Sequence, residues 1–467
     1  MDNEPDVFDG SGDPKSLGSS NVVRRLKAAL GVVLLLGVIA VLAPPSDSER
    51  KYPNRIRVTF WHGFAGEWQP IYEGMADRFN ASQTKYEVVP VSVPGDALTM
   101  KFLLSSAGGD TPDLLLNWDP ILGTWADKGL IRSYDSVMTP AEKKKYLAET
   151  YPIVKRNGMY RGKIMALIDG LDFWAVYYRL DHLKEIGLDQ NHLPKTLEEL
   201  VDMGKKLDRF DDHHRLRRVG FLPQGLAGFV PVFGGTFNKD GHIVVNTPEN
   251  LRAMRFLGES SKRLGNDNIT RFTSSLAADA GPTMPLIAGN YSIMFDGEWR
   301  VKQVAQYKPD LPYIVAPMPA PAGGKPNACN TAPNYLVIPT AAKNPQGAWE
   351  FAKFCVGFTH PEDGGRNMAE MGWVPDDLSI AHSKSYQAYL KRYPQYKVFV
   401  DLMTSPNLGM FPQGSLQKFV MDEIQKAEDE VVRGTMTPEA GLAMVEKHLA
   451  DEKQRLRRLG MPVGGSE

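Results

Sequence analysis

The chain has 467 residues, of which 42% are hydrophobic, 23% charged and 10% aromatic, a composition typical of a folded protein with a large buried core. Its 54 basic and 55 acidic residues give a formal net charge of −1. This balance excludes a general nucleic-acid coat and a polybasic membrane binder, because both need a large positive excess. Two cysteines, Cys329 and Cys355, are too few for a disulfide framework or a four-thiolate zinc site. The sequence leaves open whether they pair with each other in an oxidising compartment or stay as two buried thiols.

The first fifty residues indicate export. Residues 1–27 are small, polar and partly acidic and end in three basic residues, so we expect a disordered tail with a basic end. An uninterrupted apolar run at residues 28–43 follows, which is the order typical of a signal peptide or a membrane anchor. Pro44 stands directly after the candidate cleavage site, so the sequence does not decide whether this segment is removed. Since the basic side stays in the cytoplasm, we expect a periplasmic or extracytoplasmic protein, with residues 28–43 either cleaved or kept as a tether to the inner membrane.

Strand and helix patterns alternate after the export segment. Alternation of charged and apolar residues predicts a strand at residues 55–60, and we expect a second strand at residues 86–93 and a short buried one at residues 114–116. Helical spacing predicts a helix at residues 68–79, and another helix is expected at residues 98–106. We expect Asp119 or Thr124 to cap the helix that follows the third strand. This alternation predicts an α/β protein with a mostly parallel sheet.

The alternation restarts after Gly158. Extended segments are expected at residues 163–168 and 174–178, and helices at residues 180–185 and 196–207. Thr196 and Thr247 are predicted helix N-caps, with Glu199 at the capping-box position and Pro248 at the first helical position. Residues 312–321 are proline-rich and extended, and helices dominate from residue 346, ending in a helix at residues 438–458.

An ordered set of short segments resembles the extracellular solute-binding proteins of bacterial ABC importers, in the branch that binds maltose, oligosaccharides and glycerophosphoryl compounds. The segments are RVTFWH at 57–62, TPDLL at 111–115, WADKGLI at 125–131, RGKIMAL at 161–167, VYYR at 176–179, PKTLEEL at 194–200, GNYSIM at 289–294, DGEW at 296–299 and AWEFAKF at 348–354. The chain departs from the family pattern at Ile168, Arg179 and Leu197, where the family usually has proline, asparagine and tryptophan. The resemblance covers about residues 55–455.

The resemblance implies a two-lobed periplasmic-binding-protein fold, whose lobes are discontinuous in sequence and joined by hinge crossings. We expect one lobe at residues 51–158 plus 319–357, and the other at residues 159–318 plus 358–467. Ligand is expected in the cleft between the lobes, at the carboxyl ends of strands, and closure is expected to be a hinge motion.

A sugar has flat apolar faces and a belt of hydroxyls, so its site needs aromatic rings and planar polar groups. Such groups gather where expected strands end, and in a loop between helices near residue 373. Asp172 also lines up with the acidic ligand position of the maltose-binding relatives. The candidate ligand-binding residues are Trp61, His62, Glu67, Asn117, Trp118, Asp119, Asp172, Trp174, Gly297, Glu298, Trp299 and Trp373.

The function expected from the sequence is the carbohydrate-binding component of an ABC importer, a monomer that delivers a mono- or oligosaccharide to permease subunits in the inner membrane. No catalytic residue, metal or cofactor is expected, and no nucleic-acid partner. A phosphorylated ligand is expected to recruit arginine forks or helix N-termini. Of the arginines, only Arg300 and Arg366 stand near the candidate loops, which favours a neutral sugar over a glycerophosphodiester.

Two alternatives remain open. A secreted glycoside hydrolase would use the carboxylate pairs Asp169/Asp172 or Asp296/Glu298, although two residues of one loop rarely reach the separation of roughly 5–10 Å that hydrolysis needs. A membrane-tethered ligand sensor on the same fold would account for an anchor that is not cleaved. The sequence does not identify the ligand or the permease.

Overall fold

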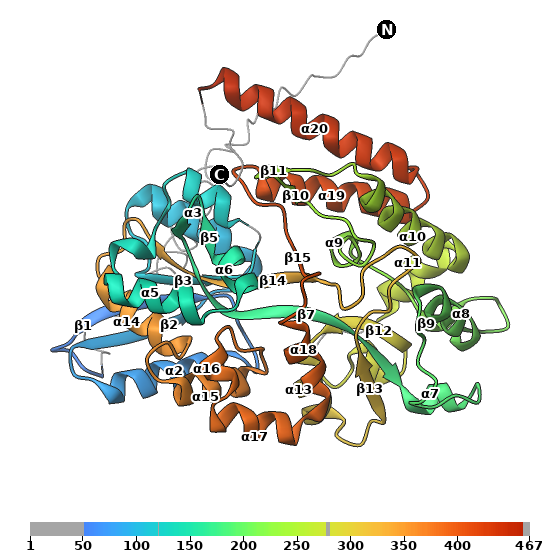
Figure 1. The fold of residues 1–467 in the computed structure, drawn as a ribbon, viewed down its shortest axis with the longest axis horizontal. Helices are drawn as coiled ribbons and strands as arrows, with labels where there is room; N and C mark the ends of the chain where they lie inside the picture. Colours follow the sequence, from blue (N-terminus) through green and yellow to red (C-terminus); the bar gives the residue numbers. More distant parts are fainter. Residues whose placement is uncertain (1–50, 120, 277–280, 461–467) are drawn as a thin grey trace, which may run out of the picture. The chain divides into compact units, whose positions relative to one another are not determined.

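The structure is a computed structural model that describes residues 51–119, 121–276 and 281–460 (Figure 1). The chain divides into two units, residues 1–55 and 56–467. Of the first unit the described part is residues 51–55, where the Arg55 guanidinium lies 3.8 Å from the centre of the Tyr52 ring. The expected tail at residues 1–27 and the expected apolar segment at residues 28–43 lie outside the described residues. Within the three described ranges, no helix is both long and apolar enough to cross a membrane.

The second unit opens with alternating strands and helices, as the sequence predicts. The elements are β1 (Ile56–His62), α2 (Gln69–Ser82), β2 (Tyr86–Ser92), α3 (Gly95–Gly108), β3 (Leu114–Asn117), α4 (Leu122–Asp127), β4 (Ile131–Arg132), η2 (Tyr134–Ser136), α5 (Pro140–Glu149) and α6 (Pro152–Gly158). Strand β1 pairs in parallel with both β2 and β3, which confirms the predicted parallel arrangement of this part.

The middle of the chain adds a long strand and a second group of helices. Its elements are β5 (Met159–Tyr160), β6 (Lys163–Ile164), β7 (Leu167–Arg179), α7 (Leu180–Lys184), α8 (Leu197–Leu207), β8 (Arg209–Phe210), β9 (Leu216–Phe221), α9 (Leu226–Phe229), β10 (Asn238–Lys239), β11 (His242–Ile243), α10 (Pro248–Leu264), α11 (Asn266–Ser275), α12 (Pro285–Ala288), β12 (Tyr291–Gly297), α13 (Trp299–Tyr307) and β13 (Tyr313–Ala316). Strand β7 thus joins the two extended segments that the sequence predicts separately.

One more long strand follows, and after it the chain is mainly helical, as predicted. The elements are β14 (Asn330–Pro339), α14 (Pro345–Cys355), α15 (Pro361–Met371), α16 (Leu378–Ala381), α17 (Lys384–Arg392), η3 (Pro394–Tyr396), α18 (Lys397–Leu402), β15 (Gly409–Met410), α19 (Gln417–Val432) and α20 (Pro438–Arg458). Helices α19 and α20 run side by side (Figure 1).

The main sheet has the strand order β2-β1-β3-β14-β7-β12-β9-β8. Strands β14 and β7 pair antiparallel at its centre, with a register shift between Pro333 and Tyr335. The shift leaves Asn334 on β14, and Asp169 and Gly170 on β7, outside the regular ladder. Such irregularities redirect side chains, and this one lies beside the residues considered below.

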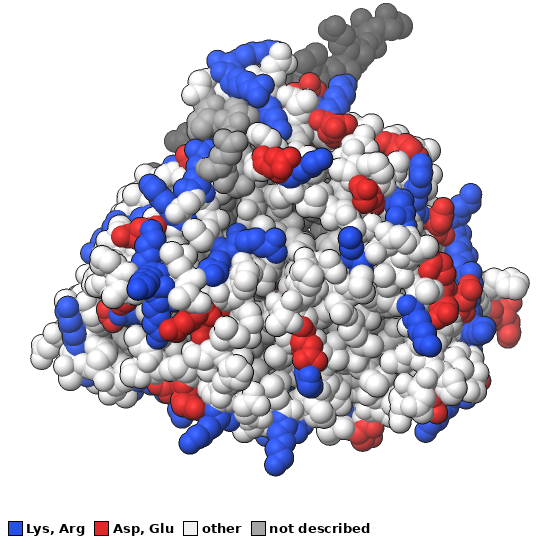
Figure 2. Space-filling view, in the orientation of Figure 1, with Lys and Arg blue, Asp and Glu red and all other residues white. Residues whose placement is uncertain are grey.

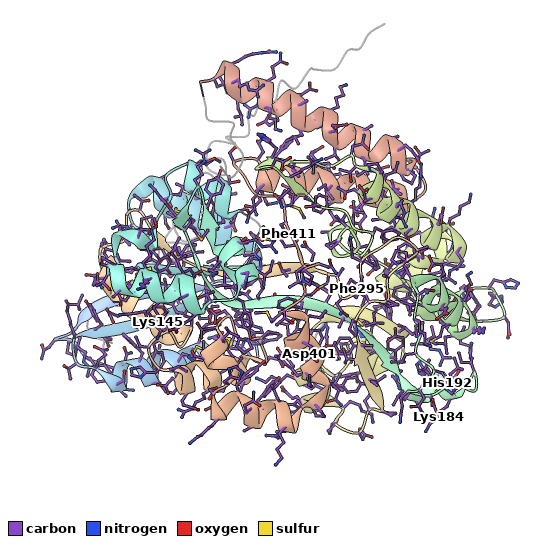
Figure 3. All side chains as sticks on the ribbon, in the orientation of Figure 1. Lys145, Lys184, His192, Phe295, Asp401 and Phe411 are labelled. Carbon is purple, nitrogen blue, oxygen red and sulfur yellow. The ribbon has the colours of Figure 1, made fainter. Side chains whose placement is uncertain are left out.

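Two large hydrophobic cores flank this sheet, and β7 passes from one to the other. Leu171 and Phe173 of β7 belong to the core that contains β1, α2 and α14, whereas Val176 and Tyr178 belong to the core that contains α8, α10, α19 and α20. Phe295 of β12, labelled in Figure 3, packs against the second core. Its ring centroid lies 5.1 Å from that of Phe229 of α9. The two cores agree with a two-lobed α/β fold. The expected lobe boundaries stay a prediction. Helix α15 is expected in the second lobe but contacts α2 and α14, which are expected in the first.

Most of the predicted helix starts are correct. The Thr196 hydroxyl accepts the Glu199 amide at the start of α8, and the Thr247 hydroxyl accepts the Asn250 amide at the start of α10. The predicted cap of α4 is wrong: its N-cap is Ile121, with no side-chain hydrogen bond. Asp119 and Thr124 instead make tertiary hydrogen bonds, Asp119 with Thr99 and Thr124 with the carbonyl of Ser415.

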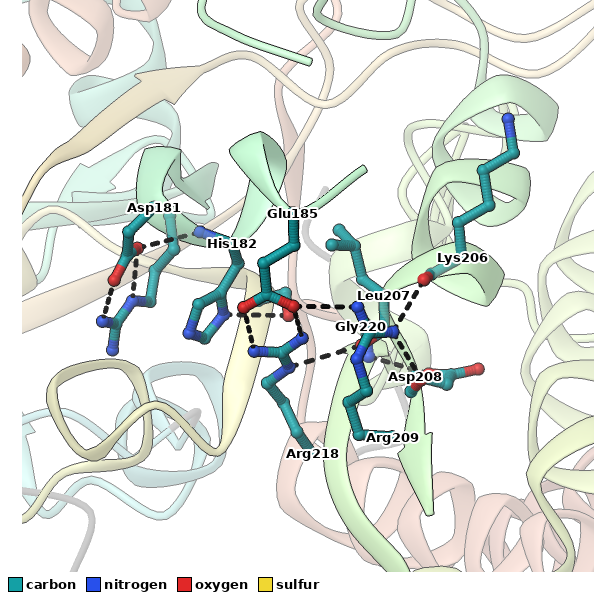
Figure 4. A network of polar contacts seen from close by, with 11 residues as sticks. Asp181, His182, Glu185, Lys206, Leu207, Asp208, Arg209, Arg218 and Gly220 are labelled. Carbon is teal, nitrogen blue, oxygen red and sulfur yellow. Dashed lines mark hydrogen bonds and ion pairs between the residues drawn. The ribbon is translucent and has the colours of Figure 1, made fainter. Parts of the chain in front are cut away.

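Charged side chains at the surface of α7, β8 and β9 pair with one another. Glu185 accepts hydrogen bonds from Arg218 and Arg209, and these bonds, led by that from Arg218, lower the Glu185 pKa to about 2 (Figure 4). On the face shown in Figure 2, basic and acidic side chains are interspersed. Cys329 and Cys355 are both buried free thiols, which resolves the pairing that the sequence leaves open.

Candidate functional site

The loops that follow β1 and β3 lie at the same edge of the sheet, because these parallel strands are paired up to His62 and Leu116. Trp118 in the second loop is half-buried, and its indole lies between Gly63 and Gly95. A Cβ at either glycine would lie within 2.6 Å of the indole, so the absence of a side chain at both positions lets the ring lie against the backbone. The half-buried Phe64 ring is 4.9 Å from the Trp118 ring.

Thr99 of α3 holds the polar residues of this edge in place. Its hydroxyl donates to Asp119 Oδ2 at 2.6 Å and accepts from Asn117 Nδ2 at 3.0 Å. Asn117 Oδ1 in turn accepts the Asp119 amide at 2.9 Å. Asn117 is 2% exposed and therefore supports the loop, whereas Asp119 is half-buried and retains an accessible edge.

Asp172 lies on β7 just after the register shift. Its carboxylate accepts a hydrogen bond from Asn334 Nδ2 at 3.5 Å, across the shift. Gly170 has φ +93°, and a Cβ there would lie 2.5 Å from the Trp373 indole. At the shift, the Trp373 ring packs against β7 at Gly170, and the Asn334 side chain reaches Asp172.

Asp172 and Glu298 form a coupled carboxyl pair. Glu298 is fully buried, and one of its oxygens accepts the Phe173 amide at 3.0 Å. Burial, and then the charge of Asp172 and a hydrogen bond with it, raise the Glu298 pKa well above its ordinary value. Burial also raises the Asp172 pKa to about 7, against the opposing hydrogen bonds from Glu298 and Asn334. Burial thus favours the protonated form of Glu298 more strongly than that of Asp172, which is the half-buried member of the pair.

Two further indoles meet next to this pair. Trp174 of β7 and Trp299 of α13 are both half-buried and form an edge-to-face pair, with ring centroids 6.0 Å apart and an interplanar angle of 87°. Trp299 lies directly over Gly297, the last residue of β12. These rings offer flat apolar surface next to the Asp172 carboxylate.

Glu67 connects the loop after β1 to α13. Its two carboxylate oxygens accept hydrogen bonds from Gln303 Nε2 at 3.0 Å and from the Tyr307 hydroxyl at 2.8 Å. Nearby, Trp68 Nε1 donates to the Met371 carbonyl at 3.3 Å. Glu67 is thus a bridge between distant segments, and each of its oxygens already accepts a hydrogen bond.

The remaining predicted residues lie at or below the surface of the site. His62 is 1% exposed, its ring stacks on Tyr72 at 4.9 Å, and burial lowers its pKa to about 4. Trp373 is 2% exposed and packs against Phe64 with ring centroids 5.3 Å apart. Trp61 is half-buried beneath the Lys101 ammonium, which lies 4.3 Å from its ring centre. His62 and Trp373 are therefore placed to support a site, not to touch a ligand.

Several residues of this region are absent from the sequence-based set. Phe64, Thr99 and Asn334 belong to it, and so does the buried Tyr72–Asp169 hydrogen bond of 2.9 Å. Burial raises the Asp169 pKa to about 7, although the Tyr72 hydroxyl opposes the shift. The polar residue Thr99, four positions after the Pro94-Gly95 turn, offers a weak local signal, whereas nothing local marks Asn334. Within the described part of the chain, no group of three or more His, Cys, Asp and Glu side chains is placed to hold a metal ion.

Comparison with known proteins bears on this arrangement. Residues 65–357 match the family model for bacterial extracellular solute-binding proteins. A probable ABC transporter-binding protein of Deinococcus radiodurans is 25% identical over 65% of this chain and 73% of the relative. A maltotriose-binding protein of Pyrococcus abyssi is 21% identical over 68% of this chain and 66% of the relative.

Solved structures show the same fold. The structure of CpMnBP1 with mannotriose bound matches with a TM-score of 0.75 and 24% identity, over 84% of this chain and 99% of that chain. The sugar-binding protein MalE from Xanthomonas citri matches with a TM-score of 0.67 and 19% identity, over 86% of this chain and 98% of that chain. The family model covers more than half of the sequence, and the fold agrees with it. The chain belongs to the bacterial extracellular solute-binding protein family.

Proposed function

We propose that this protein is the substrate-binding component of an ABC importer and that its ligand is a mono- or oligosaccharide. The observation that carries the proposal is that the indoles of Trp118, Trp174 and Trp299 are half-buried, as are the carboxylates of Asp119 and Asp172, which stand one and two positions from Trp118 and Trp174 in the sequence. Indole faces stack on the apolar faces of sugar rings, and carboxylates accept hydrogen bonds from sugar hydroxyls. The names of the Pyrococcus maltotriose-binding protein and of the mannotriose-bound structure support the same ligand class.

The ligand would lie between two lobes that close around it. We place one lobe at residues 51–158 plus 319–357 and the other at residues 159–318 plus 358–467, with the proline-rich stretch at 312–321 near a crossing. The closed form would then be presented to the permease subunits, and differential affinity of ligand for that form drives the change. The family places the protein outside the cytoplasm. We propose that residues 28–43 direct export, that they are cleaved or retained as a tether, and that the protein acts as a monomer.

A neutral ligand fits the arginine placement better than a phosphorylated one. Arg300 is 3% exposed, and its Nε donates to Asp296 at 2.7 Å, so its charge is already compensated. An sn-glycerol-3-phosphate-binding protein of Shigella dysenteriae is nevertheless 22% identical over 82% of this chain and 90% of the relative. Lys101, above Trp61, is a cation close to a candidate site residue and would serve a phosphate there. A phosphate-bearing ligand therefore belongs in the test.

The carboxylates support binding over hydrolysis. Asp169 is fully buried and accepts the Tyr72 hydroxyl, Asp296 is paired with Arg300, and Glu298 is fully buried. A glycosidase needs two carboxyl groups facing the scissile bond from opposite sides. Of the four acids considered as hydrolytic pairs, only Asp172 is half-buried and the other three are buried, so we propose a ligand-binding role without catalysis.

A thermal-shift screen tests the proposal. The purified protein is heated with mannobiose, mannotriose, maltotriose, tagatose and sn-glycerol 3-phosphate, and the wells are assayed for product. A ligand at 100 times its dissociation constant stabilises a protein by about 2.7 kcal/mol, so a binder gives a clear shift in Tm. A shift with an intact sugar supports the proposal. Product in the same wells would instead establish an enzyme, and a shift with sn-glycerol 3-phosphate alone would replace the sugar with a phosphorylated ligand.

A further inference from the structure

Three buried tyrosine hydroxyls hold the backbone of the loops that carry candidate site residues. Tyr177 of β7 donates to the Gly297 carbonyl at 2.6 Å. Tyr386 of α17 donates to the Trp373 carbonyl at 2.9 Å, and Tyr396 of η3 donates to the Gly372 carbonyl at 2.6 Å. All three tyrosines are completely buried. Because a buried hydroxyl without a partner is costly, each of these bonds fixes the position of its carbonyl.

The three tyrosines belong to one aromatic cluster. The Tyr177 ring centroid is 6.2 Å from that of Phe399, which is 5.7 Å from that of Tyr396. Tyr396 in turn lies 6.5 Å from Tyr386 in an edge-to-face contact. One rigid cluster therefore holds two loops that are more than seventy residues apart in the sequence, as the residue numbers 297 and 372 show.

Each held loop supports a ring of the candidate site. Gly297 lies directly under Trp299, since a Cβ on it would lie 1.9 Å from the indole. Trp373 fills the space beside Gly170, two residues before Asp172, and also contacts Phe64. A shift of either loop would therefore move an aromatic surface or the strand that carries Asp172.

We propose that Tyr177, Tyr386 and Tyr396 are positioning residues of the ligand site, whose hydroxyls set the place of Trp299 and Trp373 without touching ligand. Phenylalanine would fill the same space in a core, so the hydroxyl is what distinguishes these positions. Burial raises the pKa of all three hydroxyls well above its ordinary value, so they remain donors wherever the protein is folded. The assignment rests on the function proposed above.

The test replaces each tyrosine with phenylalanine in the full chain and compares the variants with Tyr134→Phe. Tyr134 is also completely buried, and its hydroxyl also donates to a backbone carbonyl, that of Leu336 at 3.1 Å. Leu336 lies inside β14, paired with Leu116 and Leu167, so this control removes the same bond from a regular part of the sheet. Three quantities are measured: the free energy of unfolding, the affinity for mannotriose and maltotriose by calorimetry, and the near-ultraviolet circular dichroism of the ligand-free protein.

We expect all four variants to lose a similar amount of stability. The three site-side variants should also bind sugar about five- to tenfold more weakly, and Tyr177→Phe should change the dichroism of the Trp174–Trp299 pair, whereas Tyr134→Phe does neither. Unchanged affinity in the three variants, or an equal loss in Tyr134→Phe, would overturn the proposal. If neither sugar binds the unaltered protein, the sugar assignment fails for these probes, and the dichroism alone decides: an unchanged spectrum in Tyr177→Phe overturns the positioning role.

Discussion

The indole of Trp299 lies so close to Gly297 that a single methyl group on that glycine would come within 1.9 Å of the ring. Gly297 ends β12, and its carbonyl is held by the Tyr177 hydroxyl at 2.6 Å. The indole also meets Trp174 edge-on. The Gly297 backbone, the strand that carries Trp174 and the Trp299 ring are thus held together. This arrangement gives a preformed surface for a flat ligand.

Substitution of Gly297 by alanine tests this relationship. Trp299 has to move, because the overlap is with its ring and the backbone beneath is fixed, so we expect a loss of roughly 1–3 kcal/mol in stability and at least tenfold in sugar affinity. Chemical denaturation and calorimetry measure the two effects. The control is Gly74→Ala in α2, where the added Cβ would lie 3.4 Å from an Arg78 guanidinium nitrogen. It should gain up to about 1 kcal/mol and keep its affinity, as expected for glycine replaced inside a helix. Equal affinities of Gly297→Ala and the unaltered protein would contradict the arrangement.

The exposure of the tryptophans predicts two different effects of alanine substitution. Trp299 is half-buried, so Trp299→Ala should weaken sugar binding by more than about tenfold, because a stacking surface is lost. Trp349 is completely buried, so Trp349→Ala should cost about 3–5 kcal/mol of stability while the folded fraction keeps its affinity. Unfolding curves and calorimetry separate the two. A Trp299→Ala protein that binds like the unaltered one would remove Trp299 from the site.

The sequence predicts features that depend on near neighbours in the chain. The Thr196 cap, the β1 strand and the start of α20 at Pro438 follow from local signals, and the structure contains all three. Trp118, which the sequence places in a loop after a strand, is half-buried in the structure.

Features that depend on distant segments could not be predicted in this way. Asn334 reaches Asp172 only because the β14–β7 register shifts, and no local pattern marks that shift. Trp373 has the loop position expected of a ligand residue, yet Phe64 and Tyr72 cover its ring. Glu67 follows the first strand as a ligand residue would, but its partner Gln303 is 236 positions away.

The Glu67 bridge should affect both stability and binding. Glu67→Ala removes the acceptors of Gln303 and Tyr307. Glu67 is half-buried and partly screened by water, so we expect a loss of about 1 kcal/mol in stability. The affinity for sugar should fall too, because the bridge holds the loop after β1 against α13. Small-angle scattering of the ligand-free variant should show an altered radius of gyration. Glu73→Ala is the control, since Glu73 pairs with Gln69 inside α2. Affinity loss in the control, or none in Glu67→Ala, would argue against a bridging role.

The buried carboxyls predict how stability depends on pH. Asp169 and Asp172 have folded pKa values of about 7, and that of Glu298 is also raised, whereas unfolded carboxyls titrate near pH 4. A group whose pKa is raised by folding binds its proton more tightly in the folded state, so its contribution is complete below about pH 4 and is lost as the pH rises through about 7. His62 acts in the opposite sense, because its pKa is lowered to about 4 and its contribution is lost as the pH falls from about 6.5.

Glu298→Gln isolates the carboxyl contribution from that of the histidines. Glutamine keeps an oxygen for the Phe173 amide but carries no proton to lose, so the contribution of Glu298 to the pH dependence is removed. The variant should therefore lose less stability than the unaltered protein when the pH is raised from about 5 to about 8. Glu185→Gln is the control: the folded pKa of Glu185 is about 2, so this substitution should lower stability equally at both pH values. Denaturant unfolding at the two pH values measures the difference. A Glu298→Gln protein with the pH dependence of the unaltered one would show that the pair does not titrate in this range.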